Sequence, residues 1–358
     1  MSYASMKKSL LQWLVCPACL QAFTLADVQV APDGVGIMDG RLICRGCNAV
    51  FPIIDGVPEL LLDSLDATTR RTAASFGLLW SRTTDDMTRE GEHLGKTLVA
   101  LSLDPPSGLI LDAGCGDGSD SVALSAQSGA EVIGVDIGKG GTRTAFDRTR
   151  HLPNVHIVRA DLCRLPFRVG QFAFIYSYGV LHHVPRPEQA VAELARVSAA
   201  AAGGALYVYE DFAERSSVLR WSLRAANVWR AVTTRLPHRL LYALCVIASP
   251  LVFLSFTVPL KVLVRVPGCR TVAAGIPFHF GRGPFDLSGD LYDRFATPVE
   301  YRYSRETAVR LVEAGGIRRA SDSAAPRLDA GGKTRDAQSH SPRMTQRLSI
   351  SIGLPIIG

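Results

Sequence analysis

Four cysteines near the start of the chain are spaced as metal ligands. They form two CxxC pairs with 24 residues between the pairs: Cys16, Cys19, Cys44 and Cys47. Two such pairs supply four thiolates at the corners of a tetrahedron, which suits zinc. Because four protein ligands leave no open coordination position, we expect a structural zinc. The other four cysteines show no pairing pattern, which favours a reducing compartment over a disulfide framework.

A glycine-rich segment follows a hydrophobic run in the middle of the chain. Leu109–Ala113 has the composition of a buried strand, and Gly114, Gly116 and Gly118 come directly after it. Glycines let the backbone bend sharply and approach a ligand closely, and a following helix would point its N-terminus at that ligand. The loop alone is not specific, because dinucleotide and phosphate binders use similar ones.

Acidic residues follow two further predicted strands and narrow the choice of ligand. Asp136 ends the run Glu131–Asp136 and lies 24 residues after Asp112, where a carboxylate can accept from both hydroxyls of a ribose. Asp161 follows the next run, where it can accept from an adenine amino group. A single aspartate of this kind is commonly a helix cap or turn residue. Three at the ends of three successive strands favour a nucleoside site.

The elements that must position these residues alternate along the chain. Short hydrophobic runs predict strands, with helical stretches such as Pro187–Val197 between them; the runs are Leu109–Ala113, Glu131–Asp136, Val155–Arg159, Phe172–Ser177 and Ala205–Tyr209. This alternation predicts an α/β fold, a Rossmann-like parallel sheet with helices on both faces. The pattern resumes near the C-terminus with a helix at Arg305–Ala314, a strand from Ile317 and a last strand at Leu348–Ile352.

Residues 109–197 resemble the class I S-adenosylmethionine-dependent methyltransferases, in the type 11 group that is similar to the ubiquinone-biosynthesis methyltransferases. The resemblance is carried by the glycine loop and by the segments Asp161–Phe167 and Ser177–Pro185. It implies S-adenosylmethionine as the cofactor. The residues that it implies as contacts are Asp112, Gly114, Cys115, Gly116, Gly118, Asp136, Ile137, Asp161, Leu162 and Ser177.

The N-terminal ribbon is similar to the Trm112-like zinc modules, which some methyltransferases carry in the same chain. The similarity includes Phe51–Ile53 and Asp55–Pro58, and the segment Ser75–Gly77 with Trp80 fits what precedes the catalytic domain in such fusions. The stretch Tyr292–Gly316 is also similar to the methyltransferase family, although an aromatic residue usually stands in the place of Gly316.

Two adjacent histidines are the candidates for a general base. His182 and His183 follow the predicted strand Phe172–Ser177, at the edge of the sheet where ligands bind in such folds. A base is needed only if the methyl acceptor must lose a proton. A histidine at this position can equally cap a helix or pack on the cofactor.

An insertion rich in arginine and then in apolar residues interrupts the pattern. The window from Arg215 to Arg270 holds nine Lys or Arg and no Asp or Glu, and Leu240–Leu260 carries no charge. By length this apolar run could span a bilayer. It lies, however, between two parts of one sheet, and Pro250 and Pro259 divide it, so we expect a helical hairpin. A buried cap and contact of residues 215–266 with an anionic membrane both remain open.

These features divide the chain into six parts: a zinc ribbon (1–62), a linker with N-terminal helices (63–106), the cofactor-binding core (107–210), the helical insertion (211–291), the returning methyltransferase segment (292–321) and a poorly ordered tail (322–358). The sequence predicts a cytoplasmic methyltransferase, peripherally associated with a membrane, that transfers a methyl group in line to a small or lipid-like acceptor.

Two alternative functions stay open. One is an RNA methyltransferase that uses the ribbon to recognise its substrate; nucleic acid is less favoured, because the arginines lead into an apolar run rather than interleaved stacking aromatics. The other is a membrane-associated adaptor without turnover, against which the intact glycine loop and its acids argue.

Overall fold

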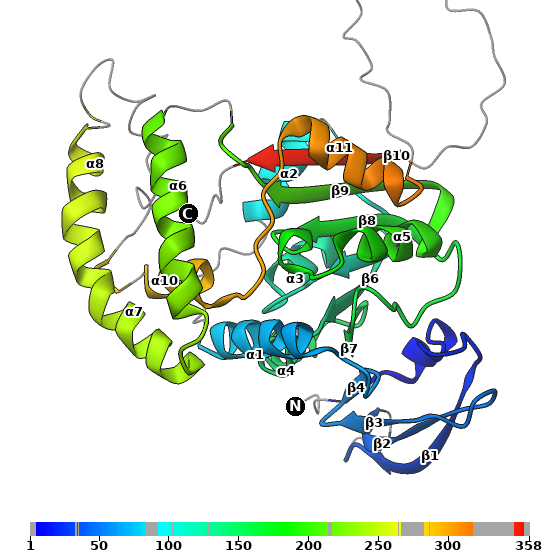
Figure 1. Ribbon diagram of the computed structural model, residues 1–358. Coiled ribbons are helices and arrows are strands. Elements are labelled where there is room, and N and C mark those ends of the chain that lie inside the picture. The colour runs from blue at the N-terminus through cyan, green and yellow to red at the C-terminus, as the bar shows by residue number, and fades with distance from the viewer. Residues whose placement is uncertain are drawn as a thin grey trace, which may run out of the picture.

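One sheet runs through the whole molecule. The computed structural model describes residues 5–32, 34, 36–82, 92–101, 103–127, 129–213, 217–263, 265, 283–285, 287–317 and 347–353. Within them, ten strands form a single sheet in the order β1-β2-β3-β4-β7-β6-β5-β8-β9-β10 (Figure 1). The predicted α/β class with helices on both faces is confirmed.

The parallel part of the sheet carries the glycine loop, which follows β5. Its strands are β5 (Gly108–Ala113), β6 (Ala130–Asp136), β7 (Val155–Ala160), β8 (Phe172–Tyr178), β9 (Ser198–Tyr209) and β10 (Arg347–Gly353). The chain runs outward from β5 through β6 to β7 and then returns to β8 on the other side of β5. This reversal is the topological switch point, beside which ligands bind at the carboxyl ends of the strands.

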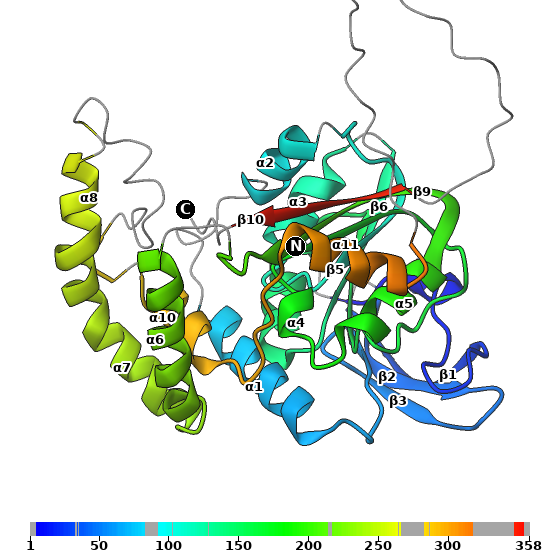
Figure 2. The same cartoon turned by 45° about the horizontal axis from the view of Figure 1, so that its top comes forward.

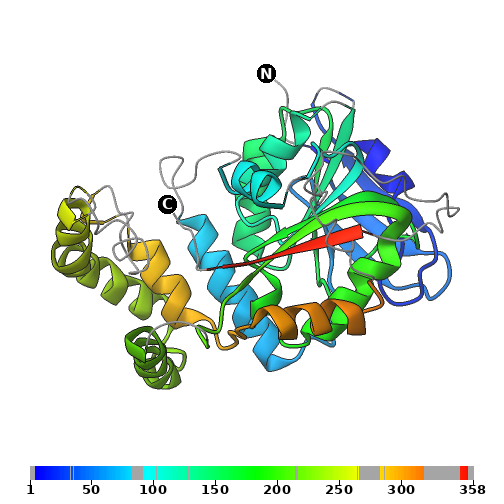
Figure 3. The ribbon, with the colours of Figure 1, turned by 90° about the horizontal axis from the view of Figure 1, so that it is seen from above.

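Helices cover the two faces of this sheet. They are α1 (Ala67–Ser81), α2 (Glu92–Leu101), α3 (Ser119–Ser125), α4 (Lys139–Thr149), α5 (Pro187–Val197) and α11 (Arg305–Ala314). α1 packs on α4 and α2 on α3, while α11 packs on α5 across the sheet from α3 (Figure 3). The helices bury the apolar side chains on both faces of the central strands, where Ile110, Leu111 and Ile133 are fully enclosed.

The N-terminal ribbon is built into the same sheet. After the short 3₁₀-helix η1 (Lys8–Gln12), its strands β1 (Phe23–Val30), β2 (Ile37–Cys44), β3 (Val50–Ile54) and β4 (Val57–Leu60) pair antiparallel in order. β4 then pairs parallel with β7, with Glu59 opposite Arg159 and Leu60 opposite Ala160. One hydrophobic cluster includes residues of both parts, such as Leu14 and Phe167. Ribbon and core are therefore one packed unit.

The predicted strand and helix positions agree with the structure, apart from a few ends. α5 and α11 have the predicted bounds, and the five predicted strands of the core are β5 to β9. β9 begins at Ser198, seven residues before the predicted start, because the small residues ahead of Ala205 continue the pairing with β8. The last strand is β10, parallel to β9 at the edge of the sheet (Figure 2). Ile317 is not in a strand, and the residues after it up to 346 lie outside the described part of the chain.

The insertion consists of α6 (Ser217–Thr233), α7 (His238–Val252), the π-helical turn η3 (Phe253–Thr257) and α8 (Val258–Leu263), followed by α10 (Ser288–Ala296). The expectation that Pro250 and Pro259 break the apolar run is wrong. His238–Leu263 is one continuous helix. The wider turn before Pro259 gives room where its ring would clash with an earlier carbonyl group. α6 and α7 follow each other closely in the chain, but each packs on α10, at the end of the molecule away from the ribbon (Figure 1).

Candidate functional site

The glycine loop after β5 approaches its neighbours too closely for any side chain. Gly114, Gly116 and Gly118 all have positive φ angles, of 89°, 53° and 82°. A Cβ atom on Gly114 would lie 2.2 Å from Val180, and one on Gly116 would lie 2.9 Å from the ring of Trp80. The predicted need for glycine here is thus explained by backbone geometry and by packing against the wall of a cavity.

That cavity lies at the carboxyl ends of β5, β6 and β7. The empty space there is about 670 Å³, counted with the open solvent at its mouth. Five of the predicted cofactor contacts line it: Gly114, Asp136, Ile137, Asp161 and Leu162. The structure therefore brings residues from three successive strands together, as the strand-end argument requires.

Asp136 is held in place by backbone donors. Its two carboxylate oxygens accept from the N–H of Gly116 at 3.1 Å and of Gly138 at 2.7 Å. Each oxygen retains a further lone pair, so the carboxylate can still accept from the hydroxyls of a ribose. Burial raises the pKa of Asp136 to about 6, against the lowering effect of those N–H groups and of Arg159.

Asp161 and Leu162 form the adjacent wall. One oxygen of Asp161 accepts from the N–H of Cys163 at 2.9 Å, which closes a tight turn after β7. Both residues line the cavity. Asp161 can thus close the turn after β7 and still face a ligand in the cavity.

Other predicted contacts lie outside the lining. Asp112 is buried beneath the loop and accepts from the Ser121 hydroxyl at 2.5 Å, and burial together with Asp120 raises its pKa to about 8. Ser177 donates to the carbonyl of Ala113 at 2.8 Å. Cys115 is buried beside the loop. Asp112 and Ser177 support the loop from the sheet, while Cys115, Gly116 and Gly118 belong to the loop itself. A contact of any of them with a cofactor stays a prediction.

The remaining lining residues are Thr69, Thr72, Phe76 and Trp80 on α1, Tyr178 at the end of β8, and Gly179, Val180, His183, Val184 and Pro185 after it. Of these, Thr69 and Thr72 lie outside the segments that carry the family resemblance. On α1 these positions recur at helical spacing, so they form one face. The segment was predicted only as a helix-compatible linker, although Phe76 and Trp80 carried a family signal.

The two candidate histidines have different surroundings. His183 lines the cavity, and its ring packs against Phe76 with centroids 5.1 Å apart. His182 is fully enclosed and stacks on Tyr209 at 3.6 Å. Burial, followed by the nearby His183 and Arg302, lowers the pKa of His182 well below its usual value. His182 is therefore a neutral packing residue, while His183 faces the site.

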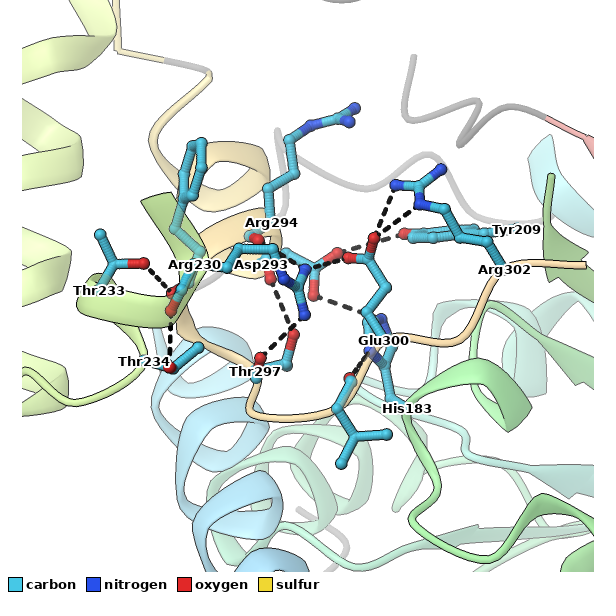
Figure 4. A network of polar contacts seen from close by, with 12 residues as sticks. His183, Tyr209, Arg230, Thr233, Thr234, Asp293, Arg294, Thr297, Glu300 and Arg302 are labelled. Carbon is cyan, nitrogen blue, oxygen red and sulfur yellow. Dashed lines mark hydrogen bonds and ion pairs between the residues drawn. The ribbon is translucent and has the colours of Figure 1, made fainter. Parts of the chain in front are cut away.

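The tautomer of His183 is set by its neighbour. Its Nδ1 lies 2.9 Å from the carbonyl oxygen of Val299, which can only accept, so Nδ1 carries the hydrogen (Figure 4). Nε2 then has a lone pair and is 3.9 Å from Oδ1 of Asp293. Within the described part of the chain, both of these atoms are buried without a hydrogen-bond partner.

Asp293 belongs to a polar network that joins the insertion to the sheet (Figure 4). Its other oxygen accepts from the Tyr209 hydroxyl at 3.3 Å. Burial raises the pKa of Asp293, with His183 opposing that shift. Close by, Glu300 pairs with Arg302 and with Arg230 of α6. The network holds Asp293 and Val299 in place around His183.

The four predicted zinc ligands come together. Their sulfur atoms all lie within 4.8 Å of one another, with Cys16 3.7 Å from Cys47 and Cys19 3.3 Å from Cys44. A tetrahedral zinc with Zn–S bonds of about 2.3 Å holds its sulfurs about 3.8 Å apart. The N–H of Gly46 points at the sulfur of Cys44 at 3.3 Å. The donor set fits a structural zinc.

Comparison with known families supports both parts of the chain. Residues 111–208 match the family model described as a methyltransferase domain, and residues 7–56 match the model of Trm112p-like proteins. An uncharacterized 37.1 kDa protein in a transposon of Streptomyces fradiae is 35% identical, over 28% of this chain and 30% of that protein. A demethylmenaquinone methyltransferase of Staphylococcus haemolyticus is 34% identical, over 24% of this chain and 37% of the enzyme.

Among solved structures, a complex of the Haloferax volcanii Trm112 methyltransferase activator with a methyltransferase is 22% identical. The match covers 36% of this chain and 57% of that one, with a TM-score of 0.32. The chain spans about a third of the length of the curated relatives above.

Proposed function

We propose that this chain, which joins a Trm112p-like zinc module to a class I methyltransferase domain, transfers a methyl group from S-adenosylmethionine to a small or lipid-like acceptor. The observation that carries the proposal is the cavity at the switch point, where Gly114, Asp136 and Asp161 come from three successive strands. In that arrangement Asp136 would hold the ribose, and Asp161 with Leu162 would hold the adenine.

The chemistry required of the protein is mainly positioning. The sulfonium of the cofactor supplies an electrophilic methyl group when it is bound, so the residues of the chain must align an acceptor with it and exclude water. The cavity is suited to this, because much of its lining is apolar, including Phe76, Trp80, Val180, Val184 and Pro185. An apolar lining favours an apolar acceptor. The protein would meet such an acceptor in the cytoplasm or at the surface of a membrane.

His183 is the general base in this proposal. Nε2 is the nitrogen that can take up a proton, and Asp293 lies 3.9 Å away, where its charge would stabilise the imidazolium that forms. A hydroxyl that donates to Nε2 at roughly 2.8 Å would give this buried nitrogen the hydrogen-bond partner that it otherwise lacks within the described chain. Asp293 would then be a positioning residue.

The experiment that tests the activity follows label from the methyl group of the cofactor. The purified chain is incubated with labelled S-adenosylmethionine and an extract of the source cells, which is then separated into lipid, small-molecule, RNA and protein fractions. We expect label in the lipid or small-molecule fraction. Asp136→Asn is the control that should incorporate none. Label confined to RNA would support the alternative acceptor class, and no label with tight cofactor binding would support the adaptor.

The base is tested once a labelled product is in hand. His183→Asn should lower kcat by about 10²-fold or more, because it removes proton transfer. His182→Asn is the matched control and should retain most of the parent's kcat if it folds. Asp293→Asn should lower kcat and shift the pH profile of kcat to lower pH, since the imidazolium loses its counter-charge and the neutral base persists to lower pH. An unchanged kcat in His183→Asn would contradict the assignment.

A further inference from the structure

The insertion exposes an unusual amount of apolar surface. Along α7, η3 and α8, only one narrow row that includes Leu241, Cys245 and Ser249 is buried against the protein. The other faces expose large apolar side chains, with Ile247 at 74% and Leu251 at 69%; the remaining ones are Leu240, Leu244, Leu254, Phe256, Val258 and Val262. On α6 the exposed side chains are Trp221, Val228, Trp229 and Val232. Large apolar side chains exposed in this number on consecutive helices indicate an interaction site.

The opposite faces of these helices are fixed to the methyltransferase core. Arg230 of α6 donates to the carbonyls of Arg294 at 2.8 Å and of Thr297 at 3.0 Å, besides its ion pair with Glu300 (Figure 4). On α7, His238 is 3.0 Å from the Tyr292 hydroxyl. The exposed apolar faces therefore point away from the core, on helices that are anchored to it.

The charges around this surface have one sign. The window from Arg215 to Arg270 contains no acid. The basic residues that the structure shows exposed beside the apolar faces are Arg220, Arg224, Arg235, Arg239, Lys261 and Arg265. Arg224 lies over the ring of Trp221, 5.1 Å from its centroid. Tryptophan and arginine side by side suit the headgroup region of a bilayer, and each basic residue there strengthens binding to anionic lipids.

We infer that the exposed faces of α6 and of α7–α8 form a docking surface for an anionic membrane. The inference rests on the proposed function only in naming the acceptor as a lipid-phase molecule. His238–Leu263 is long and apolar enough to cross a bilayer by length and composition alone. It lies along the surface instead, because its inner row and the following α10 pack on the same core.

Docking would bring the cavity close to the lipid. Leu241 and Cys245 of α7 share a hydrophobic cluster with Leu79 of α1, and Phe76 and Trp80 pack against that cluster. The same Phe76 and Trp80 line the cavity. Between the membrane surface and the cavity there would then be two packed helices, α7 and α1.

The test is sedimentation of the full, zinc-loaded chain with vesicles of phosphatidylcholine alone or mixed with phosphatidylserine. We expect the parent to sediment with the mixed vesicles and to be released by salt. The double variant Ile247→Ser and Leu251→Ser should bind about tenfold or more weakly, since it removes apolar contact area. Arg220→Gln with Arg224→Gln should lose most of the preference for phosphatidylserine.

Two controls keep the outcomes distinct. Val169→Ser removes an equally exposed apolar side chain in the loop before β8, at 70% exposure, and should bind vesicles as the parent does. Calorimetry with S-adenosylmethionine shows that each variant is folded, and failure there in every protein would overturn the proposed function but not the surface. The inference is overturned if the parent stays in the supernatant with mixed vesicles. It is also overturned if the parent binds RNA in place of vesicles, or self-associates through these helices in a way that Ile247→Ser with Leu251→Ser abolishes.

Discussion

Asp136 is the residue whose ionisation should govern binding of the cofactor. Its pKa is raised to about 6 by burial, and the carboxylate is the form that accepts from two hydroxyls. We expect the affinity for S-adenosylmethionine to fall as the pH is lowered through about 6. Asp136→Asn should cost about 2–4 kcal/mol of binding at pH 7 and abolish this pH dependence. Calorimetry at several pH values measures both effects. Equal affinity of the parent and of Asp136→Asn for the cofactor would contradict the assignment of Asp136 to the site.

The same shift has the opposite sign for stability without ligand. An ordinary aspartate ionises near 3.8, so the unliganded folded state holds the Asp136 proton more tightly than the unfolded chain does. This proton therefore favours folding below about pH 4, and the contribution is lost as the pH rises through about 6. Cofactor that binds the carboxylate form would compensate at neutral pH.

Gly116 should be sensitive to substitution for two separable reasons. In Gly116→Ala, the positive φ costs about 1 kcal/mol or more, and the new Cβ would also displace Trp80 from the cavity wall. Gly129→Ala is a matched control, because Gly129 has φ 69° but nothing within 4 Å of a Cβ. Both variants should lower the melting temperature, but only Gly116→Ala should weaken cofactor binding. Equal cofactor affinity in the two would contradict the role of Trp80.

At the scale of elements, the pairing of β4 with β7 connects the ribbon to the cavity that we propose as the cofactor site. Arg159 of β7 forms an ion pair with Glu59 of β4 at 3.0 Å and donates to the carbonyl of Ile137 at 3.1 Å. Ile137 lines the cavity next to Asp136. The edge strand of the ribbon therefore positions one wall of the site.

Arg159→Met should consequently disturb cofactor binding from outside the cavity. The loss of its charge removes one of the effects that lower the pKa of Asp136. We expect the pH midpoint for cofactor affinity to move upward and the affinity at pH 7 to fall. Arg41→Met removes an exposed strand arginine that pairs with Asp27 within the ribbon, and it should leave both quantities unchanged. A pH midpoint identical to the parent's in Arg159→Met would exclude this coupling.

For the whole molecule, the shared core changes what loss of zinc should do. Residues 1–62 were expected to form a separate module, yet Leu14 forms a β-bridge with Phe167, and the N–H of Val15 donates to the carbonyl of Pro166 at 2.8 Å. A ribbon that loosens would also expose the edge of β7. We therefore expect destabilisation to extend into the methyltransferase domain.

This expectation is measured by thermal unfolding with and without a zinc chelator. Chelation, or the variant Cys44→Ser, should lower the main transition of the whole chain and reduce cofactor affinity. Cys245→Ser, which alters a buried cysteine of the insertion, should keep its zinc by elemental analysis. A low-temperature transition for the ribbon alone, with the main transition unmoved, would show that the two parts are independent.

The sequence by itself determined the elements and the chemistry of the local motifs. The spacing of four cysteines, the glycine loop and the acids after successive strands are short-range patterns, and they predicted the zinc ligands and the walls around Asp136 and Asp161. Local patterns suffice there because the ends of parallel strands must meet at one edge of the sheet. The same reasoning predicted α5 and α11 with their observed bounds.

Only the tertiary structure decided which of two adjacent histidines faces the cavity, because their environments come from distant segments. His182 is enclosed by Tyr209 of β9, while His183 is oriented by Val299 and faces Asp293 of α10. The continuity of the apolar helix through Pro250 likewise appeared only in the structure, where His238–Leu263 is one helix with Pro250 inside it. The joining of ribbon and core into one sheet depends on β4 meeting β7, a pairing between edges that neither segment encodes alone.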